Sequence, residues 1–261
     1  MFASETVRNA AKFRESLPPI LAFIKTQLEP ARASEPEPLG ATAIGLLDRV
    51  GCWLATMHRL DQTADFQAHM SGLRSLIELT VDLGLLLKNP SSHDMLVAWE
   101  VSARFKHGEL FVAYASKHKT SWAPTAAAAF VAEHRDEVVS SRQQYWSGRH
   151  PSRWTGRDLR TDAMDVDSRF PKLGIEQLYE ELYRYLCWQV HGSGLVALRS
   201  NDGGGVIASI LMAFKVAAEL GLAASEIAMR LLERWRPSDQ TDLQRAREAW
   251  LLKFGELAAL P

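Results

Sequence analysis

Apolar residues recur at intervals of three and four positions along nearly the whole chain, and this periodicity restricts the fold more than any other feature of the sequence. The stretch LRSLIELTVDLGLLL is the clearest example, because it is apolar almost all round. Alternating apolar and polar runs bounded by turns, the pattern of β-strands, are missing. The sequence therefore predicts an all-α protein.

Proline- and glycine-rich segments divide the predicted helices into three regions. We expect an N-terminal helical arm with a proline-rich connector at residues 1–38, a helical bundle core domain at residues 39–200, and C-terminal helices packed on the core at residues 201–261. In the arm, Pro18 and Pro19 are expected to interrupt a helix that runs to about residue 27.

Four helices are predicted to open the core domain, and these four could form a bundle. An irregular insertion rich in tryptophan and arginine follows, with one short helix. After it come a further helix and three C-terminal helices. The expected helices cover about 41–60, 63–88, 92–117, a segment after Pro124, 173–191, 206–220, 224–235 and 238–257, and the insertion covers 146–171.

The composition limits the classes of partner. A chain of 261 residues with 47% hydrophobic content can bury a core of its own. A formal net charge of -1 argues against a surface coated in basic charge, so any contact with nucleic acid must be local. The cysteines, Cys52 and Cys187, have no second thiol nearby, which predicts buried free thiols rather than a disulfide.

The N-terminal segment and the most apolar late segment both bear on location. MFASETVRNAAKFRES carries charges where a signal peptide needs an apolar run, so we expect a cytoplasmic protein. VIASILMAFKVAAELGLAA carries Lys215 and Glu219, which are too polar to span a bilayer comfortably. We predict no transmembrane segment.

The segment YRYLCWQVHGSG contains the first candidate site. Arg184 and His191 lie seven positions apart, which is almost two helical turns, so they can point into one cleft. The last helical turn favours the imidazolium form of His191, and Arg184 can bind a phosphate with two donors. Alternatively, His191 caps the last carbonyls of the helix and Arg184 pairs with Glu180 or Glu181 on a solvated face.

A second candidate is the stripe formed by Arg74, Glu78 and Asp82, which lie four positions apart. The surrounding residues are almost all leucine, isoleucine and valine, so this helix should be buried and its charges should need partners. Arg74 and Glu78 can form an internal ion pair that fixes helix packing, or they can converge with His191 on a polar pocket.

A third candidate combines arginines with aromatic residues between positions 142 and 160. Arginine and tryptophan together can bind phosphates and stack on bases, which makes this segment a candidate RNA-binding region. Alternatively, Trp146 and Trp154 fill the bundle while the arginines stay solvated or pair with the neighbouring aspartates, which we expect at a solvated helix start. The RNA-binding candidates are Arg142, Arg149, Arg153 and Arg157.

Several other chemistries lack their sequence signature. No glutamate precedes a histidine by three positions, and no HExxH motif or phosphate-binding loop occurs. The histidines other than His191 are scattered without the spacing of metal ligands, and we assign them no role. We therefore expect neither a metal nor a cofactor.

Two resemblances follow from these motifs. An arginine and a histidine a few residues apart in an all-helical domain resemble the signature of the HEPN superfamily. More specifically, residues 66–198 resemble a bacterial helical family of unknown function. That resemblance rests on Arg74 and Glu78, on a tryptophan-glycine segment with Trp154, and on a helix with Tyr179, Tyr183 and His191.

The HEPN resemblance implies a metal-independent endoribonuclease of a toxin or phage-defence system, commonly a homodimer. Arg184 would stabilise the cleaved phosphate, and His191 would act as general base or acid on the ribose 2′-hydroxyl. Arg74, Glu78, Tyr179, Tyr183 and Trp154, on which the resemblance to the unknown-function family rests, are the candidate supporting or pocket residues. The alternative hypothesis is a non-catalytic helical module that binds a small ligand or a protein partner.

Overall fold

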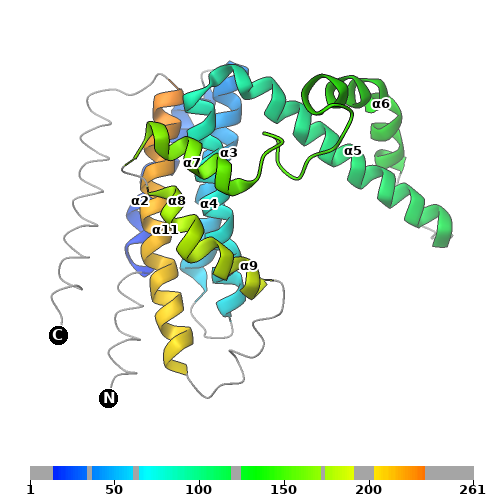
Figure 1. The fold of residues 1–261 in the computed structure, drawn as a ribbon. Coiled ribbons are helices and arrows are strands. Elements are labelled where there is room, and N and C mark those ends of the chain that lie inside the picture. Colours follow the sequence, from blue (N-terminus) through cyan, green and yellow to red (C-terminus); the bar gives the residue numbers. More distant parts are fainter. Residues whose placement is uncertain are drawn as a thin grey trace, which may run out of the picture. The chain divides into compact units, whose positions relative to one another are not determined.

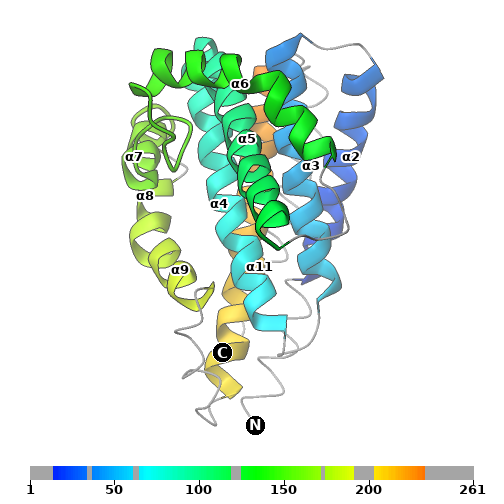
Figure 2. The same ribbon diagram turned by 90° about the vertical axis from the view of Figure 1, so that its right-hand side faces the viewer.

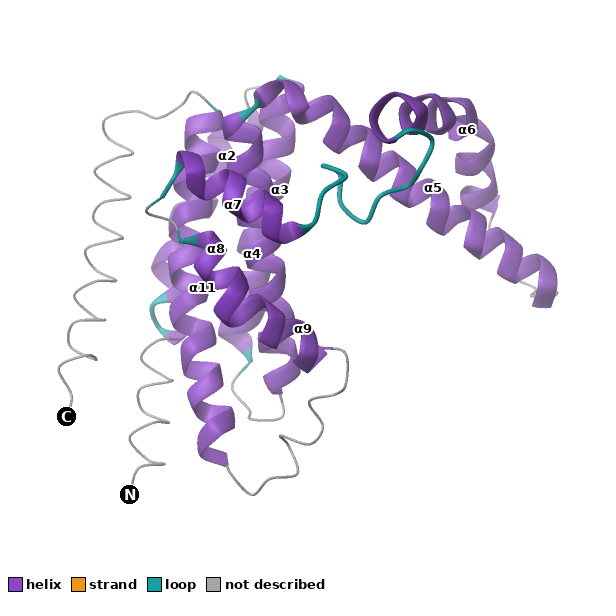
Figure 3. Ribbon diagram, in the orientation of Figure 1, coloured by secondary structure: helices purple, strands orange, loops and turns teal. Residues whose placement is uncertain are grey.

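The structure, a computed structural model, describes residues 14–33, 37–60, 65–118, 125–171, 174–190 and 203–232. Every regular element in these ranges is helical, as Figure 3 shows. The prediction of an all-α fold is confirmed. Among the described helices, none has both the length and the apolar character needed to cross a bilayer.

The chain divides into two compact units. The first comprises Met1–Lys88 together with Ala163–Pro261, and the second comprises Asn89–Asp162. The second unit is therefore inserted into the sequence of the first. These boundaries differ from the expected divisions after residues 38 and 200.

Four long helices form the centre of the first unit. They are α2 (Leu17–Ala33), α3 (Pro38–Arg59), α4 (Phe66–Lys88) and α11 (Gly203–Leu231), and they lie side by side in Figures 1 and 2. Helix α11 contacts each of the other three. The buried side chains at the centre include Leu47, Leu54, Met57, Leu73, Leu76, Ile77, Leu83 and Leu86.

Helix α4 is buried along most of its length, as its apolar sequence predicts. A row of shorter elements runs along it: α7 (Leu159–Arg169), α8 (Ile175–Leu178), the π-helical turn η3 (Tyr179–Tyr183) and α9 (Arg184–Val190), with α8, η3 and α9 in contact with α4 (Figure 2). The carboxylate of Asp167 accepts hydrogen bonds from the backbone N–H groups of Ile175 (3.0 Å) and Glu176 (2.8 Å). These bonds fix the start of α8.

The second unit is built on a helical hairpin. It contains the short 3₁₀ turn η2 (Pro90–Ser92), α5 (His93–His118) and α6 (Thr125–Trp146), followed by a loop that leads to α7. Phe105, Val131 and Val138 form a small buried cluster between α5 and α6. The helices approach closely at Gly108, where an added Cβ would lie 2.8 Å from Cγ2 of Val131.

Three predictions about the helices are wrong. A turn at Glu15 and Ser16 precedes α2, and Pro18 and Pro19 lie in the first turn of this helix, so an interruption occurs near the prolines as predicted. The predicted end near residue 27 is wrong, because α2 continues to Ala33 and the connector is shorter than expected. The bundle contains α2, α3, α4 and α11, whereas the third and fourth predicted helices are α5 and α6 of the second unit.

The third correction concerns the C-terminal helices. The segments expected at 206–220 and 224–235 belong to one continuous helix, α11, up to Leu231, because Gly221 inside it did not act as a stop. The helix expected at 238–257 lies outside the described residues. The cysteines are free thiols as predicted, but Cys52 is exposed and Cys187 is half-buried, so neither is fully buried.

The packing of α7 against α4 can be tested by a matched pair of glycine substitutions. A Cβ added at Gly84 would lie 2.7 Å and 3.0 Å from the two Cγ methyls of Val166, whereas Gly45 has nothing within 4 Å. Alanine favours a helix over glycine by roughly 0.5–1 kcal/mol, and overpacking costs about 1–3 kcal/mol. We expect urea denaturation to show that Gly45→Ala raises the free energy of unfolding and that Gly84→Ala lowers it.

The double variant Gly84→Ala/Val166→Ala should recover part of the loss, because removing the Val166 methyls opens the space that the new Cβ needs. Equal stabilisation by Gly45→Ala and Gly84→Ala would contradict the observed contact between α4 and α7.

Candidate functional site

Arg74, Glu78 and Tyr183 form a hydrogen-bonded cluster between α4 and η3. Nε of Arg74 lies 3.1 Å from Oε1 of Glu78 and 3.2 Å from the hydroxyl of Tyr183. The Tyr183 hydroxyl in turn donates a short hydrogen bond to Oε1 of Glu78. Because Arg74 and Glu78 are four positions apart on one helix face, a single partner on η3 can reach both. This polar cluster links η3, and with it α9, to α4.

Electrostatics keep the Tyr183 hydroxyl protonated. Burial raises the pKa of Tyr183, and its hydrogen bond to the negative Glu78 raises it further, while Arg74 acts in the opposite direction. Burial alone would lower the pKa of Arg74, but Tyr183 and Glu78 outweigh it and the net shift is upward. At neutral pH, Tyr183 is therefore a hydrogen-bond donor rather than a proton acceptor.

Aromatic contacts orient the cluster. The rings of Tyr179 and Tyr183 are stacked, with centroids 5.2 Å apart and an interplanar angle of 19°. The guanidinium carbon of Arg74 lies 5.5 Å from the centroid of the Tyr183 ring. Both tyrosines belong to the π-helical turn, a widened turn that is frequent at functional sites. The structure thus brings four of the predicted supporting residues together.

Arg184 is exposed on α9. Its side chain is 72% accessible, and it lies 3.6 Å from Oε2 of Glu180, the pairing that the alternative interpretation required. Tyr185 and Trp188 are also partly exposed on this helix, at 36% and 45%, with their rings 6.1 Å apart. His191 follows the last residue of α9 and lies outside the described residues. The predicted pairing of Arg184 with His191 therefore stays a prediction.

Trp154, the remaining supporting candidate, belongs to the second unit. Its side chain is buried, and its carbonyl accepts a hydrogen bond of 2.9 Å from Nε1 of the buried Trp146. Both tryptophans thus fill the interior, as the alternative interpretation of this segment predicts.

Two of the RNA-binding candidates neutralise a buried carboxylate. Asp162 is fully buried, and its Oδ2 accepts hydrogen bonds of 2.8 Å from Nε of Arg153 and 2.8 Å from Oγ1 of Thr155. Nη2 of Arg157 lies 2.9 Å from Oδ1 as an ion pair, and Oδ1 accepts no hydrogen bond from a described residue. The expectation that these aspartates are solvated is wrong for Asp162 because its charge is matched internally.

Arg142, a third RNA-binding candidate, holds a polar chain that the sequence analysis did not find. Nε of Arg142 donates to Oγ of Ser102 at 2.8 Å, and Oγ of Ser102 lies 3.0 Å from Nδ1 of His150. Because Arg142 can only donate, the Ser102 hydroxyl is free to donate to Nδ1, which leaves the proton of a neutral His150 on Nε2. Burial lowers the pKa of His150, and Arg142, Lys106 and His107 lower it further.

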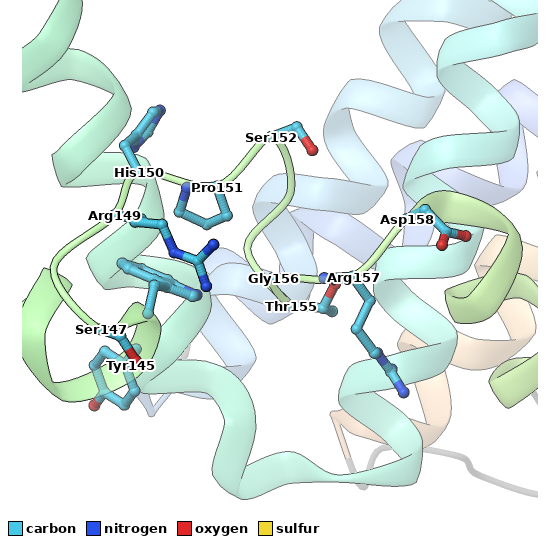
Figure 4. Close-up of a pocket in the computed structure, with 11 residues that line it drawn as sticks. Tyr145, Ser147, Arg149, His150, Pro151, Ser152, Thr155, Gly156, Arg157 and Asp158 are labelled. Carbon is cyan, nitrogen blue, oxygen red and sulfur yellow. Dashed lines mark hydrogen bonds between the residues drawn. The ribbon is translucent and has the colours of Figure 1, made fainter.

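A pocket of about 570 Å³ lies within the second unit, and His150 of the Arg142–Ser102–His150 contacts is among its lining residues. It lies between the end of α6, the following loop and the start of α7. Figure 4 shows the guanidinium of Arg149, the fourth candidate, extending into the hollow toward the segment that carries Thr155 and Gly156. The lining comprises Tyr145, Trp146, Ser147, Arg149, His150, Pro151, Ser152, Thr155, Gly156, Arg157 and Asp158.

A comparison with known protein families finds a family model that matches this chain. The model of Family of unknown function (DUF5677) matches residues 54–205, more than half of the chain. The chain belongs to this family. The match confirms the resemblance to a family of unknown function. It spans α4 to α9, so it includes the Arg74–Glu78–Tyr183 cluster and the whole second unit. Neither the curated proteins nor the solved structures gave a significant match.

Within the described part of this DUF5677 chain, no three histidine, cysteine, aspartate or glutamate side chains gather as metal ligands would. His69 on α4 is nevertheless a buried group that the sequence analysis passed over. Neither ring nitrogen makes a hydrogen bond of good geometry with a described residue. Burial lowers the pKa of His69, while Asp65 and the nearby carbonyl of Leu60 raise it. Its position on the apolar helix α4 was the sequence feature that could have indicated a buried histidine.

The Tyr183 cluster predicts a loss of stability in alkali. An ordinary tyrosine ionises near pH 10.0, and the pKa of Tyr183 lies above that value in the folded chain. Above pH 10.0 the unfolded state therefore binds fewer protons than the folded state, so the free energy of unfolding falls as the pH rises, by at most about 1.4 kcal/mol per pH unit. Urea denaturation between pH 8.5 and about 11 measures this slope.

Tyr183→Phe should remove this component of the slope, and Glu78→Gln should reduce it, because Glu78 is the second cause of the shift after burial. Identical slopes for the wild type and Tyr183→Phe would show that the hydroxyl is not held in the way the geometry indicates.

Proposed function

We propose that this chain is a metal-independent endoribonuclease of the HEPN type, in which Arg184 binds the scissile phosphate and His191 transfers protons. The observation that carries the proposal is the exposure of Arg184. Its side chain is 72% accessible, and its Nη1 lies 3.6 Å from Oε2 of Glu180, a loose contact in which a phosphate can replace the carboxylate. Arg184 also lies on the helix that ends at Val190, the residue before His191.

The proposed reaction needs only a base, an acid and a cation. The base removes the proton of the ribose 2′-hydroxyl, whose oxygen attacks the adjacent phosphorus. The bond from phosphorus to the 5′-oxygen breaks, and the acid protonates that oxygen. The products are a 2′,3′-cyclic phosphate and a free 5′-hydroxyl. His191 serves as base or acid, and Arg184 stabilises the negative charge on the phosphoryl oxygens.

The neighbouring residues of α9 support binding of a single strand. Tyr185 and Trp188 present partly exposed rings beside Arg184, and unpaired bases stack on such rings at a gain of about 1–3 kcal/mol per base. The Arg74–Glu78–Tyr183 cluster holds this helix against α4 and so serves a positioning role. A toxin or phage-defence setting is part of the proposal through the HEPN resemblance alone.

Cleavage in the presence of a chelator tests the proposal. Purified wild-type protein should cleave single-stranded RNA in EDTA and leave a 2′,3′-cyclic phosphate end, which mass spectrometry of the fragments identifies. Arg184→Ala and His191→Ala should each lower the rate by about 10²-fold or more, because each removes a group that acts in the transition state.

Arg59→Ala provides a matched control, since Arg59 is an exposed arginine on α3. Its rate should equal that of the wild type, and circular dichroism should show equal helicity for all variants. No cleavage by the wild type, or equal cleavage by all variants, would remove the proposal.

The proposal includes a homodimer, the common state of HEPN nucleases. An exposed apolar patch on α5 supports it: Leu110, Phe111 and Tyr114 are 60%, 50% and 53% accessible, and Tyr114 lies three positions after Phe111 and four after Leu110. Large apolar side chains grouped in this way on a helix mark contact surfaces. A second copy of the same hairpin offers a matching patch, as a two-fold contact requires.

Leu110→Glu tests the dimer. Light scattering at micromolar concentration should give the wild type twice the 29.2 kDa of one chain and the variant a single chain, because the new charge would be buried in the contact. Met212→Glu, at an apolar residue 48% accessible on α11, should stay dimeric. A monomeric wild type, or a dimeric Leu110→Glu variant, would contradict the proposed contact.

A second candidate function is a non-catalytic helical module that binds a small ligand or a protein partner. The observation in its favour is that Arg74, Glu78 and Tyr183 already satisfy one another. A cluster of this kind needs no substrate to be stable. Absence of cleavage, with the fold intact, would favour this candidate.

A further inference from the structure

We propose that the pocket of the second unit binds a mononucleotide, with Arg149 as the ligand of its phosphate. This site lies apart from the Arg184–His191 chemistry in the sequence and needs no cleavage of RNA, so it goes beyond the proposed function.

The inference rests on which arginines between positions 142 and 157 have partners. Arg142 is occupied by Ser102, and Arg153 and Arg157 are occupied by the buried Asp162. The guanidinium of Arg149 has no hydrogen bond or ion pair with any described residue, and it extends into the hollow (Figure 4). An arginine aimed into a pocket without a carboxylate partner is ready to bind an anion with two parallel donors.

The backbone fixes the position of Arg149. The preceding residues Ser147 and Gly148 both adopt the left-handed conformation, with φ of 51° and 78°. The turn is closed by hydrogen bonds from the N–H of Gly148 to the carbonyl of Arg142 (2.9 Å) and from the N–H of Arg149 to the carbonyl of Trp146 (3.1 Å). A non-glycine residue at positive φ is uncommon, and such conformations gather at binding sites.

The charge balance of the pocket favours a phosphate. Asp162 is not among the lining residues and is matched by Arg153 and Arg157. The side chain of Asp158 accepts hydrogen bonds from the N–H and the hydroxyl of Thr161. Figure 4 places Asp158 on the other side of the view from Arg149. His150 is also among the lining residues, and its Nδ1 is engaged by Oγ of Ser102. The hydroxyls of Ser147 and Ser152 line the pocket and have no hydrogen-bond partner among the described residues.

The size and the rings of the pocket indicate more than a bare phosphate. About 570 Å³ lies in the range of small-molecule sites and is far larger than one phosphate group. Tyr145 lines the pocket with a partly exposed ring, next to the ring of Trp146 with centroids 5.6 Å apart. A flat base can lie against such a surface while its phosphate binds Arg149. A nucleoside monophosphate combines both chemical features.

Calorimetric titration of the full chain tests this site with the four ribonucleoside monophosphates, the corresponding nucleosides and inorganic phosphate. We expect at least one monophosphate to bind, and both its nucleoside and inorganic phosphate to bind at least ten-fold more weakly. Arg149→Gln should weaken that monophosphate at least ten-fold. Arg135→Gln, which removes an exposed arginine 58% accessible on α6, should leave the affinity unchanged.

The imidazole of His150 gives a second readout that folding alone does not move. Its pKa lies below the ordinary 6.5 in the free protein, and a phosphate bound nearby should raise it in the wild type but not in Arg149→Gln, as followed by NMR titration of the ring protons. The proposal is overturned if none of the monophosphates binds, if Arg149→Gln binds as tightly as the wild type, or if nucleoside or inorganic phosphate binds equally well.

Discussion

The position of η3 and α9 against α4 depends on the hydrogen bonds that join Arg74 and Glu78 to Tyr183. Two charges on a mostly apolar, buried helix would be unfavourable without partners, and Tyr183 is the one side chain outside α4 that contacts both in hydrogen-bond geometry among the described residues. The same contact anchors the π-helical turn. Because α9 follows that turn directly, the cluster also sets where Arg184, Tyr185 and Trp188 are presented.

The second unit uses its charges in a related way. Several of its arginines bind internal partners. Arg153 and Arg157 form ion pairs with the buried Asp162. Arg142 donates a hydrogen bond to Ser102, whose hydroxyl also contacts His150. A basic segment in the sequence is therefore a poor guide to a basic surface. What distinguishes Arg149 is that it follows the turn at Ser147 and Gly148 into a pocket and forms no ion pair with a carboxylate of the described residues.

The sequence alone predicts the helices well where periodicity is strong, as in α3 and α4. It predicts the pairing of Arg74 with Glu78, because an i, i+4 spacing on an apolar helix leaves few alternatives. It does not predict that Pro18 and Pro19 fall in a first turn or that α11 continues through Gly221. It also does not predict that residues 89–162 form a compact unit of their own. Those outcomes depend on which faces meet, and tertiary contacts between distant segments decide that. The Ser102–His150 contact could not be predicted for the same reason, because the two residues are 48 positions apart in the sequence.

The central claim is that the Tyr183 hydroxyl anchors α9 to α4, and hydrogen exchange of the α9 amides in the native state measures it most directly. The account predicts that Tyr183→Phe speeds exchange at residues 184–190 while exchange in α2 and α3 stays as in the wild type, because the lost bonds tie only the η3 and α9 segment to the bundle. Unchanged exchange at residues 184–190, or equal acceleration throughout the first unit, would contradict it.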